Sequence, residues 1–299
     1  PKAFQNDAIM QLLVRGRDAE AVLQWLCTAD VDVPVDRTVY TGVLNERGTY
    51  EADVTLTRLA HDEFLWVTSS ASVVRDADWI TRHVSADQQV SVTDVTGAFA
   101  VLGVMGPNAR ALLQSVSRAD LSAEAFPFGS SREIDLGTST VRATRITYVG
   151  ELGWELYVPA EFAVSVFELL TSAGRDFGLA NAGYYAINCL RLEKGYRAFG
   201  PELNPDYNPV EAGLMFAVKL KTDIPFVGRA CVEQAKAQGV RRRLVSFVLA
   251  DPDVMMWGGE LLLRDGEGTG QVTSAAFGTT VGSCVGLAYV WRPDGDIVM

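Results

Sequence analysis

The chain has 299 residues, a length that suggests two domains at roughly 150 residues each. Its 37 Asp and Glu residues outnumber 26 Lys and Arg residues, so the formal net charge is −11. This acidic balance argues against a general nucleic-acid binder, which would show a basic face. The chain contains no apolar run of the ~18 residues that a membrane helix needs, so we expect neither nucleic acid nor membrane as a partner.

Histidine and cysteine are too sparse and too scattered to suggest a metal site. His61 and His83 are the two histidines, which leaves few positions for a histidine-rich site or a Ser-His-Asp mechanism. The four cysteines are widely separated and have no CxxC spacing, a pattern typical of reduced thiols in an intracellular protein. We therefore expect no metal and a cytoplasmic location. The mitochondrial matrix is the alternative, because the chain starts at Pro1 and a targeting segment or another domain could precede it.

Strand and helix patterns alternate over the first two thirds of the chain. We expect, in order, a helix at 18–27, strands at 38–44, 50–59 and 64–67, a helix at 72–84, a strand at 99–105, a helix opened by Gly106-Pro107, a hairpin at 131–147, and helices at 160–175 and 181–194. These elements predict an α+β domain.

The last third of the chain has a different pattern. Residues 196–229 are rich in Pro, Gly, Asn and Asp, and the segment after 243 reads as short strands at 244–249, 260–264, 269–274 and 284–291. Short strands separated by Gly-rich turns indicate a small sandwich or barrel, which we expect to be incomplete at Met299.

Two motifs are better explained by ordinary structure than by function. The glycine-rich run at 266–270 has strands on both sides, whereas a phosphate-binding loop needs a following helix, so a hairpin turn is expected. The three arginines at 241–243 are too few for nucleic-acid binding and read as a solvated strand face that could help to dock another domain.

Asp53 interrupts a strand of Val, Thr and Leu, where aspartate is disfavoured. One interpretation is a solvent-facing edge position. The other is a carboxylate held rigidly in a pocket, where it can accept a proton from an amine.

Tyr148 and Glu155 bracket a tight turn formed by Gly150 and Gly153. A glutamate at this position can accept two parallel hydrogen bonds from a 2-amino-4-oxo ring such as a pterin. The alternative is an exposed hairpin that binds nothing.

Several segments resemble the aminomethyltransferase (glycine cleavage T-protein) family. The turn at 148–155 (YVGELGWE) is similar to the YxGExGxE turn of that family. Further similarity lies in the hairpin at 39–53, the helix at 190–197, and the segments 208–214 and 226–229. Within the family, the segments 29–31, 121–128, 150–155 and 275–278 look most like the C-terminal tetrahydrofolate-binding region of sarcosine and dimethylglycine dehydrogenases.

The resemblance implies an organisation and a set of site residues. It implies a folate-binding α+β domain at 1–200, a connecting segment that completes it at 201–240, and a barrel-like β domain at 241–299. Asp53 would be the catalytic acidic residue beside the reactive folate nitrogens, and Glu155 would hold the pterin ring. Tyr40 and Tyr148 would line the pocket, and Arg191 and Arg229 are weaker assignments that could instead be structural ion-pair partners. Thr57 departs from the family pattern, which can carry an aromatic residue there.

The resemblance also implies a reaction. In such dehydrogenases an N-terminal flavin oxidoreductase domain, with FAD, oxidises an N-methyl amine, and the one-carbon unit passes to tetrahydrofolate as 5,10-methylenetetrahydrofolate. The protein would chiefly supply proximity and orientation to reactants that are already reactive. Two alternatives are a stand-alone folate-dependent aminomethyltransferase or demethylase with another methyl donor, and a non-catalytic docking or channel module.

Overall fold

The structure is a computed structural model that describes residues 2–5 and 9–298. The chain forms two compact units, each assembled from separate stretches of sequence. The first unit contains the chain up to Leu23, 31–40 and 54–184; the second contains 24–30, 41–53 and everything from Tyr185 on. Two strands, β3 (Thr38–Leu44) and β4 (Tyr50–Ala60), belong partly to each unit.

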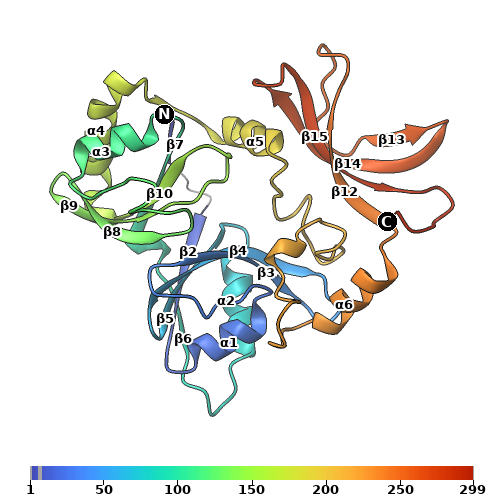
Figure 1. Ribbon diagram of the computed structural model, residues 1–299, viewed down its shortest axis with the longest axis horizontal. Helices are drawn as coiled ribbons and strands as arrows, with labels where there is room; N and C mark the ends of the chain where they lie inside the picture. The colour runs from blue at the N-terminus through green and yellow to red at the C-terminus, as the bar shows by residue number, and fades with distance from the viewer. Residues whose placement is uncertain (1, 6–8, 299) are drawn as a thin grey trace. The chain divides into compact units, whose positions relative to one another are not determined.

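A six-stranded sheet forms one half of the first unit (Figure 1). Its strands, in spatial order, are β11 (Ala180–Asn181), β1 (Lys2–Gln5), β7 (Phe99–Met105), β10 (Gly153–Pro159), β9 (Ser139–Thr144) and β8 (Ser131–Leu136). All neighbouring pairs are antiparallel except β1 with β11. The expected hairpin at 131–147 is therefore confirmed as β8 and β9.

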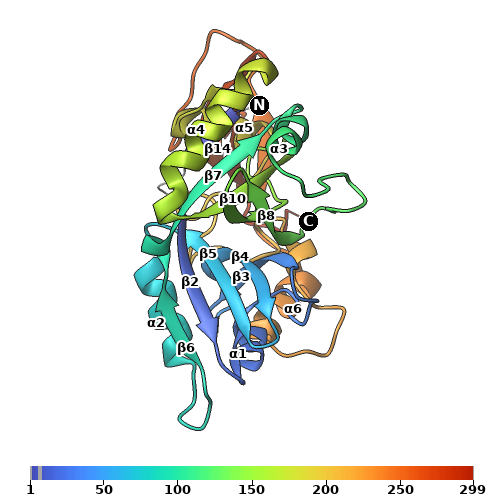
Figure 2. The ribbon, with the colours of Figure 1, turned by 90° about the vertical axis from the view of Figure 1, so that its left-hand side faces the viewer.

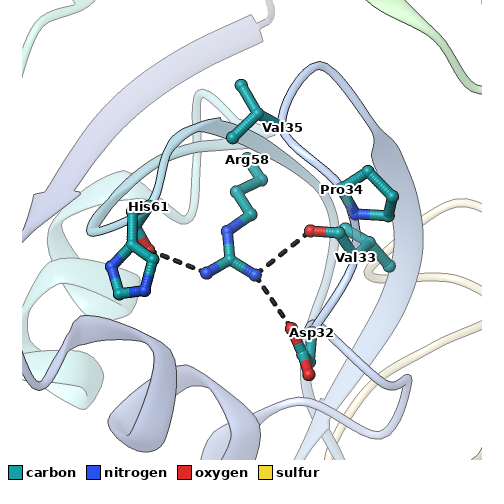
Figure 3. Close-up of a pocket in the computed structure, with 6 residues that line it drawn as sticks. All are labelled: Asp32, Val33, Pro34, Val35, Arg58 and His61. Carbon is teal, nitrogen blue, oxygen red and sulfur yellow. Dashed lines mark hydrogen bonds and ion pairs between the residues drawn. The ribbon is translucent and has the colours of Figure 1, made fainter.

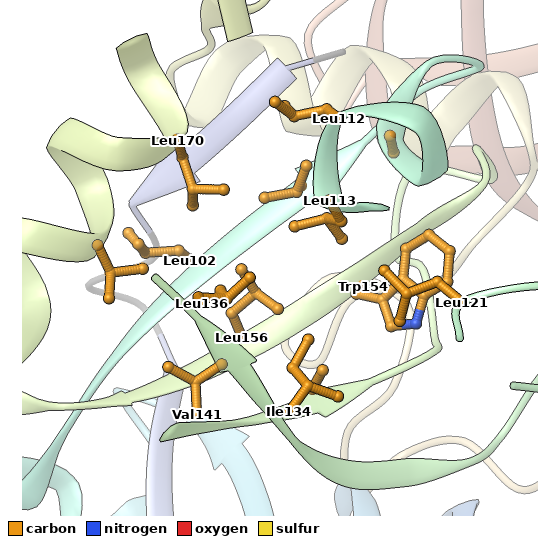
Figure 4. Close-up of a cluster of buried hydrophobic side chains, with 14 of the residues drawn as sticks. Leu102, Leu112, Leu113, Leu121, Ile134, Leu136, Val141, Trp154, Leu156 and Leu170 are labelled. Atoms are coloured by element: carbon orange, nitrogen blue, oxygen red, sulfur yellow. The ribbon is translucent and has the colours of Figure 1, made fainter. Parts of the chain in front are cut away.

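Two helices, α3 (Ala109–Val116) and α4 (Ala163–Gly174), cover one face of this sheet. Alternate residues of β10, Trp154 and Leu156, point into the core beneath the helices, where they meet Leu113 and Leu170 (Figure 4). α3 begins two residues after Pro107, so the proline precedes the helix rather than occupying its first turn. Three short 3-10 turns lie elsewhere in the unit: η1 (Thr96–Ala98), η2 (Ala160–Phe162) and η3 (Arg175–Phe177).

A five-stranded sheet contains the hairpin expected at 38–59. Its order is β3, β4, β5 (Glu63–Ser69), β2 (Ile9–Arg15) and β6 (Ser91–Asp94), and Figure 2 shows β2, β5 and β4 side by side. The expected helices at 18–27 and 72–84 are present as α1 (Ala19–Leu26) and α2 (Val73–Arg82), and α2 packs against β2, β5 and β6. The sequence patterns did not predict β2 or β6.

The second unit carries the strands expected at the end of the chain. Its sheet has the order β12 (Arg242–Val248), β15 (Ser283–Trp291), β14 (Glu267–Gly278) and β13 (Leu261–Arg264). One side packs Leu244, Leu287 and Tyr289 against Leu192 of α5 (Tyr184–Glu193). Within the described residues this sheet is open rather than a closed barrel. The unit also contains η4 (Met215–Ala217) and α6 (Arg229–Gln238), a helix that was not predicted.

The fold class is therefore α+β, followed by a small all-β sheet, as expected. The glycine-rich run at 266–270 forms the hairpin turn and adjacent strand of β13 and β14, with Asp265 and Gly266 at positive φ. Among residues 2–5 and 9–298, no helix combines the length and the apolar character needed to cross a bilayer.

Candidate functional site

Glu155 is a buried carboxylate near the centre of the six-stranded sheet. It lies on β10, between Gly103 of β7 and Thr144 of β9. Its neighbours Trp154 and Leu156 point into the helix-covered core, so the alternation of the strand turns Glu155 to the opposite face. Gly103 has no side chain, so this neighbour on β7 places no side chain beside the carboxylate.

Tyr157 is the partner of Glu155. Its hydroxyl donates a hydrogen bond to Glu155 Oε2 at 2.9 Å, and both side chains are buried. Burial raises the pKa of the Glu155 carboxyl, and the hydrogen bond from Tyr157 opposes part of that rise. Burial and the adjacent Glu155 raise the pKa of Tyr157 well above its usual value, so Tyr157 remains a donor.

Within residues 9–298, Glu155 forms no ion pair and has no other side-chain hydrogen bond. A buried carboxylate with a single neutral donor still has acceptor capacity to fill. The arrangement suits a ligand that offers two adjacent N–H donors. Sequence reasoning missed Tyr157, although its i+2 spacing from Glu155 on a strand places the two side chains on one face.

The two glycines before Glu155 have different roles. Gly150 is at φ +73°, a left-handed conformation that lets the chain turn before β10. Gly153 starts β10 close against β7, where an added Cβ would lie 2.2 Å from Met105 Sδ and 2.5 Å from Val104 O. Gly150 is thus required by its left-handed backbone conformation, and Gly153 by the close approach of β10 to β7.

The two candidate tyrosines belong to the same unit as Glu155. Tyr148 lies in the segment before β10 and is 40% exposed, whereas Tyr40 lies on β3 and is half-buried. Neither replaces Tyr157 as the hydroxyl donor to Glu155. Their proposed role in lining a pocket stays a prediction. Thr57, where the sequence departs from the family pattern, is buried with its hydroxyl 2.7 Å from that of Thr38.

Asp53 lies on β4 in the second unit and is half-buried. β4 lies between β3 and β5, and its pairing with β5 runs from Thr55 to Ala60, so Asp53 lies two residues before that paired stretch. Burial raises the pKa of the nearby Tyr50 hydroxyl; the negative charge of Asp53 raises it further, and Arg197 lowers it. Asp53 and Arg197 thus both lie near the Tyr50 hydroxyl, and all three residues belong to the second unit.

Arg191 has protein partners for its Nε and Nη1 atoms within the second unit. Its Nη1 forms an ion pair with Glu202 Oε2 at 3.0 Å and also donates to Tyr196 O, while its Nε donates to Asn188 Oδ1. Both Arg191 and Glu202 are buried. These contacts favour the structural interpretation of Arg191.

Arg229 likewise has protein partners. Its Nε forms an ion pair with Glu233 at 2.8 Å, one helical turn further along α6, and its Nη1 donates to Ile224 O. The guanidinium carbon also lies 5.7 Å from the centroid of the Phe226 ring.

A cavity of about 350 Å³ in the first unit surrounds Arg58 and is lined by Asp32, Val33, Pro34, Val35 and His61 (Figure 3). Arg58 Nη1 contacts Asp32 and Val33 O, and its Nη2 contacts Glu20 and His61 O. The guanidinium is thus committed to the protein and offers little to a ligand. The part of the chain that the structure describes holds no group of three or more His, Cys, Asp or Glu side chains that could bind a metal.

The fold defines a class of protein through comparison with a solved structure. The crystal structure of glycine cleavage system aminomethyltransferase T from Bartonella henselae superposes with a TM-score of 0.86 at 25% identity. The match covers 97% of this chain and 78% of that chain. The fold is therefore that of an aminomethyltransferase.

The chain belongs to the glycine cleavage T-protein (GCVT) family. The family model for the GCVT N-terminal domain matches residues 3–222, and that for the glycine cleavage T-protein C-terminal barrel domain matches 242–296. Mitochondrial sarcosine dehydrogenase from Homo sapiens is 41% identical, with 95% of this chain covered. Mitochondrial dimethylglycine dehydrogenase from Mus musculus is 38% identical, with 93% covered. This chain spans 32% of the length of each of these two relatives.

Proposed function

We propose that the chain is a tetrahydrofolate-binding one-carbon transfer domain. It would capture the one-carbon unit released by oxidative demethylation of sarcosine or dimethylglycine as 5,10-methylenetetrahydrofolate. The observation that carries the proposal is the buried Glu155 carboxylate, whose one side-chain donor in the described residues is the Tyr157 hydroxyl. Membership of the T-protein family and the two dehydrogenase relatives support the reaction class.

The pterin ring matches the needs of Glu155. Its 2-amino group and adjacent ring N–H are parallel donors that a carboxylate can accept together. In the buried setting of Glu155, such bonds replace the hydration that the carboxylate has lost, so they contribute strongly to binding. Tyr40 and Tyr148 are the proposed aromatic lining of the folate pocket.

Asp53 is the proposed proton acceptor. When formaldehyde is the one-carbon donor, N5 and N10 of tetrahydrofolate each form a bond to its carbon and each loses a proton, and the carbonyl oxygen leaves as water. A carboxylate on a rigid strand would stabilise the positive charge that develops on a nitrogen and accept its proton. Orientation of reactants supplies the rest of the acceleration.

The one-carbon unit would come from a flavin oxidoreductase domain that carries FAD, and the demethylated substrate would be a small N-methyl amine. The greater length of both dehydrogenase relatives supports such a partner. Both relatives are mitochondrial by name, which favours the matrix over the cytoplasm as the location.

A stand-alone aminomethyltransferase acting on another donor is the second candidate. It is favoured by the extent of the match to the Bartonella aminomethyltransferase, 78% of which is covered. Supplying the chain with formaldehyde and tetrahydrofolate discriminates between the two. Enzyme-dependent formation of 5,10-methylenetetrahydrofolate supports the first candidate, and its absence supports the second.

Titration of tetrahydrofolate into the 299-residue chain tests the site by calorimetry. We expect Glu155→Ala and Glu155→Gln to weaken binding by at least about tenfold, because each loses charge-assisted hydrogen bonds. Glu161→Ala, which changes an exposed glutamate two residues beyond β10, is the control and should bind like the wild type. Equal affinity of all four proteins, or no binding to the wild type, would refute the assignment of Glu155.

A further inference from the structure

A second cavity, of about 460 Å³, lies wholly within the second unit. It is formed over β12, β14 and β15 and the segment that precedes them. Three arginines and three aromatic residues dominate its lining: Arg241, Arg242, Arg292, Tyr207, Tyr289 and Trp291. Glu211 also lines the cavity, so the three arginines stand against one carboxylate in the lining of a chain whose formal charge is −11.

The inner part of this cavity is rigid. The rings of Tyr207 and Tyr289 stack with their centroids 3.7 Å apart and their planes within 8°. The Tyr289 hydroxyl donates to Glu202 O at 2.9 Å, and the Arg242 guanidinium lies 4.5 Å from the centroid of Tyr207. These contacts hold the inner wall of the cavity in one arrangement, which lowers the ordering cost of binding a ligand beside it.

Arg242 is held in place by an acidic partner. Its Nε forms an ion pair with Glu211 Oε1 at 2.9 Å, and its Nη2 donates to the carbonyl oxygen of Asp206. These bonds leave Nη1 unused among the described residues. The guanidinium is therefore oriented by the protein while one edge is still able to donate.

Three of the uncharged polar side chains that line the cavity already donate hydrogen bonds to backbone carbonyl oxygens. Trp291 Nε1 donates to Gly268 O at 3.1 Å, Thr273 Oγ1 to Leu287 O at 3.0 Å, and Gln271 Nε2 to Gly259 O at 3.2 Å. These bonds fix the half-buried indole of Trp291 at the cavity wall.

The rim supplies guanidinium N–H groups that have no protein acceptor in the described part of the chain, on Arg241 and on one nitrogen of Arg292, which is ion-paired with Asp294. Arg241 is exposed and, within residues 9–298, forms no ion pair or hydrogen bond through its side chain. Arg292 uses Nε and Nη2 on Asp294, which leaves its Nη1 available. Guanidinium groups bind carboxylates and phosphates in preference to neutral acceptors, because the fork of donors matches two oxygens.

We propose that this cavity binds a small planar anion, with its carboxylate or phosphate on the rim arginines Arg241 and Arg292 and its flat part against Trp291. The site goes beyond the pterin recognition proposed for Glu155 and does not rest on it. Carboxylate and phosphate share the oxyanion chemistry that the arginines recognise.

Three probes distinguish the sources of the anion: inorganic phosphate, glutarate and phthalate, each titrated into the 299-residue chain at constant ionic strength with calorimetric detection. We expect phthalate to bind more tightly than glutarate, because its ring can stack on Trp291, and Trp291→Leu to remove that preference. Binding of phosphate alone identifies a phosphate group as the anion, and binding of the carboxylates alone identifies a carboxylate. In either case Arg241→Gln and Arg292→Gln should each weaken binding by about tenfold.

Arg264→Gln is the matched control, because Arg264 is 84% exposed on β13 of the same sheet and does not line the cavity. It should bind every probe like the wild type, and thermal unfolding checks that each variant is folded. The proposal is overturned if the wild type binds none of the three probes at millimolar concentration. It is equally overturned if Arg264→Gln weakens binding as much as Arg241→Gln does. Anion binding would then depend on the total charge of the protein and not on contacts in the cavity.

Discussion

The guanidinium of Arg191 and the carboxylate of Glu202 form a buried ion pair at 3.0 Å within the second unit. Glu202 Oε2 also accepts the backbone N–H of Ala198, and its Oε1 accepts the hydroxyl of Ser274 at 2.6 Å. One carboxylate thereby joins α5, the segment after it and β14. Such a hydrogen-bonded charge pair fixes how these three pieces of chain meet.

We expect Glu202→Ala to lower the free energy of unfolding by roughly 3–5 kcal/mol, because it leaves the Arg191 charge buried without its partner. Urea denaturation measures the change. The exposed ion pair of Arg229 with Glu233 provides the control, since Glu233→Ala should cost less than about 1 kcal/mol. A similar decrease in the free energy of unfolding for the two variants would show that the buried ion pair is no more important for stability than the exposed one.

Hydrophobic periodicity predicted much of the fold. The hairpin at 38–59, the helix at 72–84 and the strands of the C-terminal sheet have strong local patterns, and each forms close to its expected place. β6 lacks such a pattern: Ser91–Asp94 is polar and forms the edge of its sheet by pairing with β2, about 80 residues earlier in the chain. A strand that depends on a distant partner leaves little trace in its own sequence.

The candidate site shows the same limit. The turn before β10 marked Glu155, but the contact with Tyr157 required knowledge that both residues lie on a strand buried on both faces. The partner of Arg191 could not be identified, because Glu202 lies in a segment without periodicity. The residue types in the sequence identified carboxylates and arginines that could take part in a reaction or bind a ligand. Which of them already form hydrogen bonds or ion pairs within the protein depends on the tertiary structure.

Gly153→Ala should destabilise the protein by about 1–3 kcal/mol through overpacking. The new methyl group would lie 2.2 Å from Met105 Sδ and 2.5 Å from Val104 O, and the backbone oxygen cannot move aside easily. Gly97→Ala is the control, because nothing lies within 4 Å of the Cβ position there. Thermal unfolding should give a clearly lower Tm for Gly153→Ala alone; an unchanged Tm would mean that β10 can shift away from β7.

Glu155→Gln should change the pH dependence of stability. Burial raises the pKa of Glu155 above its ordinary value of 4.5, so the folded protein holds this proton more tightly than the unfolded chain does. That contribution is complete below pH 4.5 and is lost as the pH rises through the folded pKa. Glutamine does not titrate, so the stability of Glu155→Gln relative to the wild type should increase with pH from about 4.5 upward.

Denaturation of both proteins at a series of pH values measures this difference. Glu161→Gln, which makes the same substitution at an exposed position, is the matched control. A flat difference for Glu155→Gln would contradict the raised pKa. A variant that is more stable at neutral pH yet binds tetrahydrofolate poorly would indicate that Glu155 is kept for binding at a cost in stability.

Asp53→Asn should separate catalysis from binding. Asparagine keeps the size of the side chain and its place on β4 but cannot accept a proton, so product formation should fall by about 10²–10⁴-fold. The Kd for tetrahydrofolate should stay close to that of the wild type, because the proposed pterin contacts belong to Glu155. The measurement is the rate of 5,10-methylenetetrahydrofolate formation from formaldehyde, after subtraction of the reaction without protein, alongside a calorimetric titration. An unchanged net rate for Asp53→Asn would contradict the role of Asp53 as proton acceptor. A net rate of zero for both proteins, with tetrahydrofolate still bound, would instead support the non-catalytic module, since a domain that only binds folate has no need of a proton acceptor.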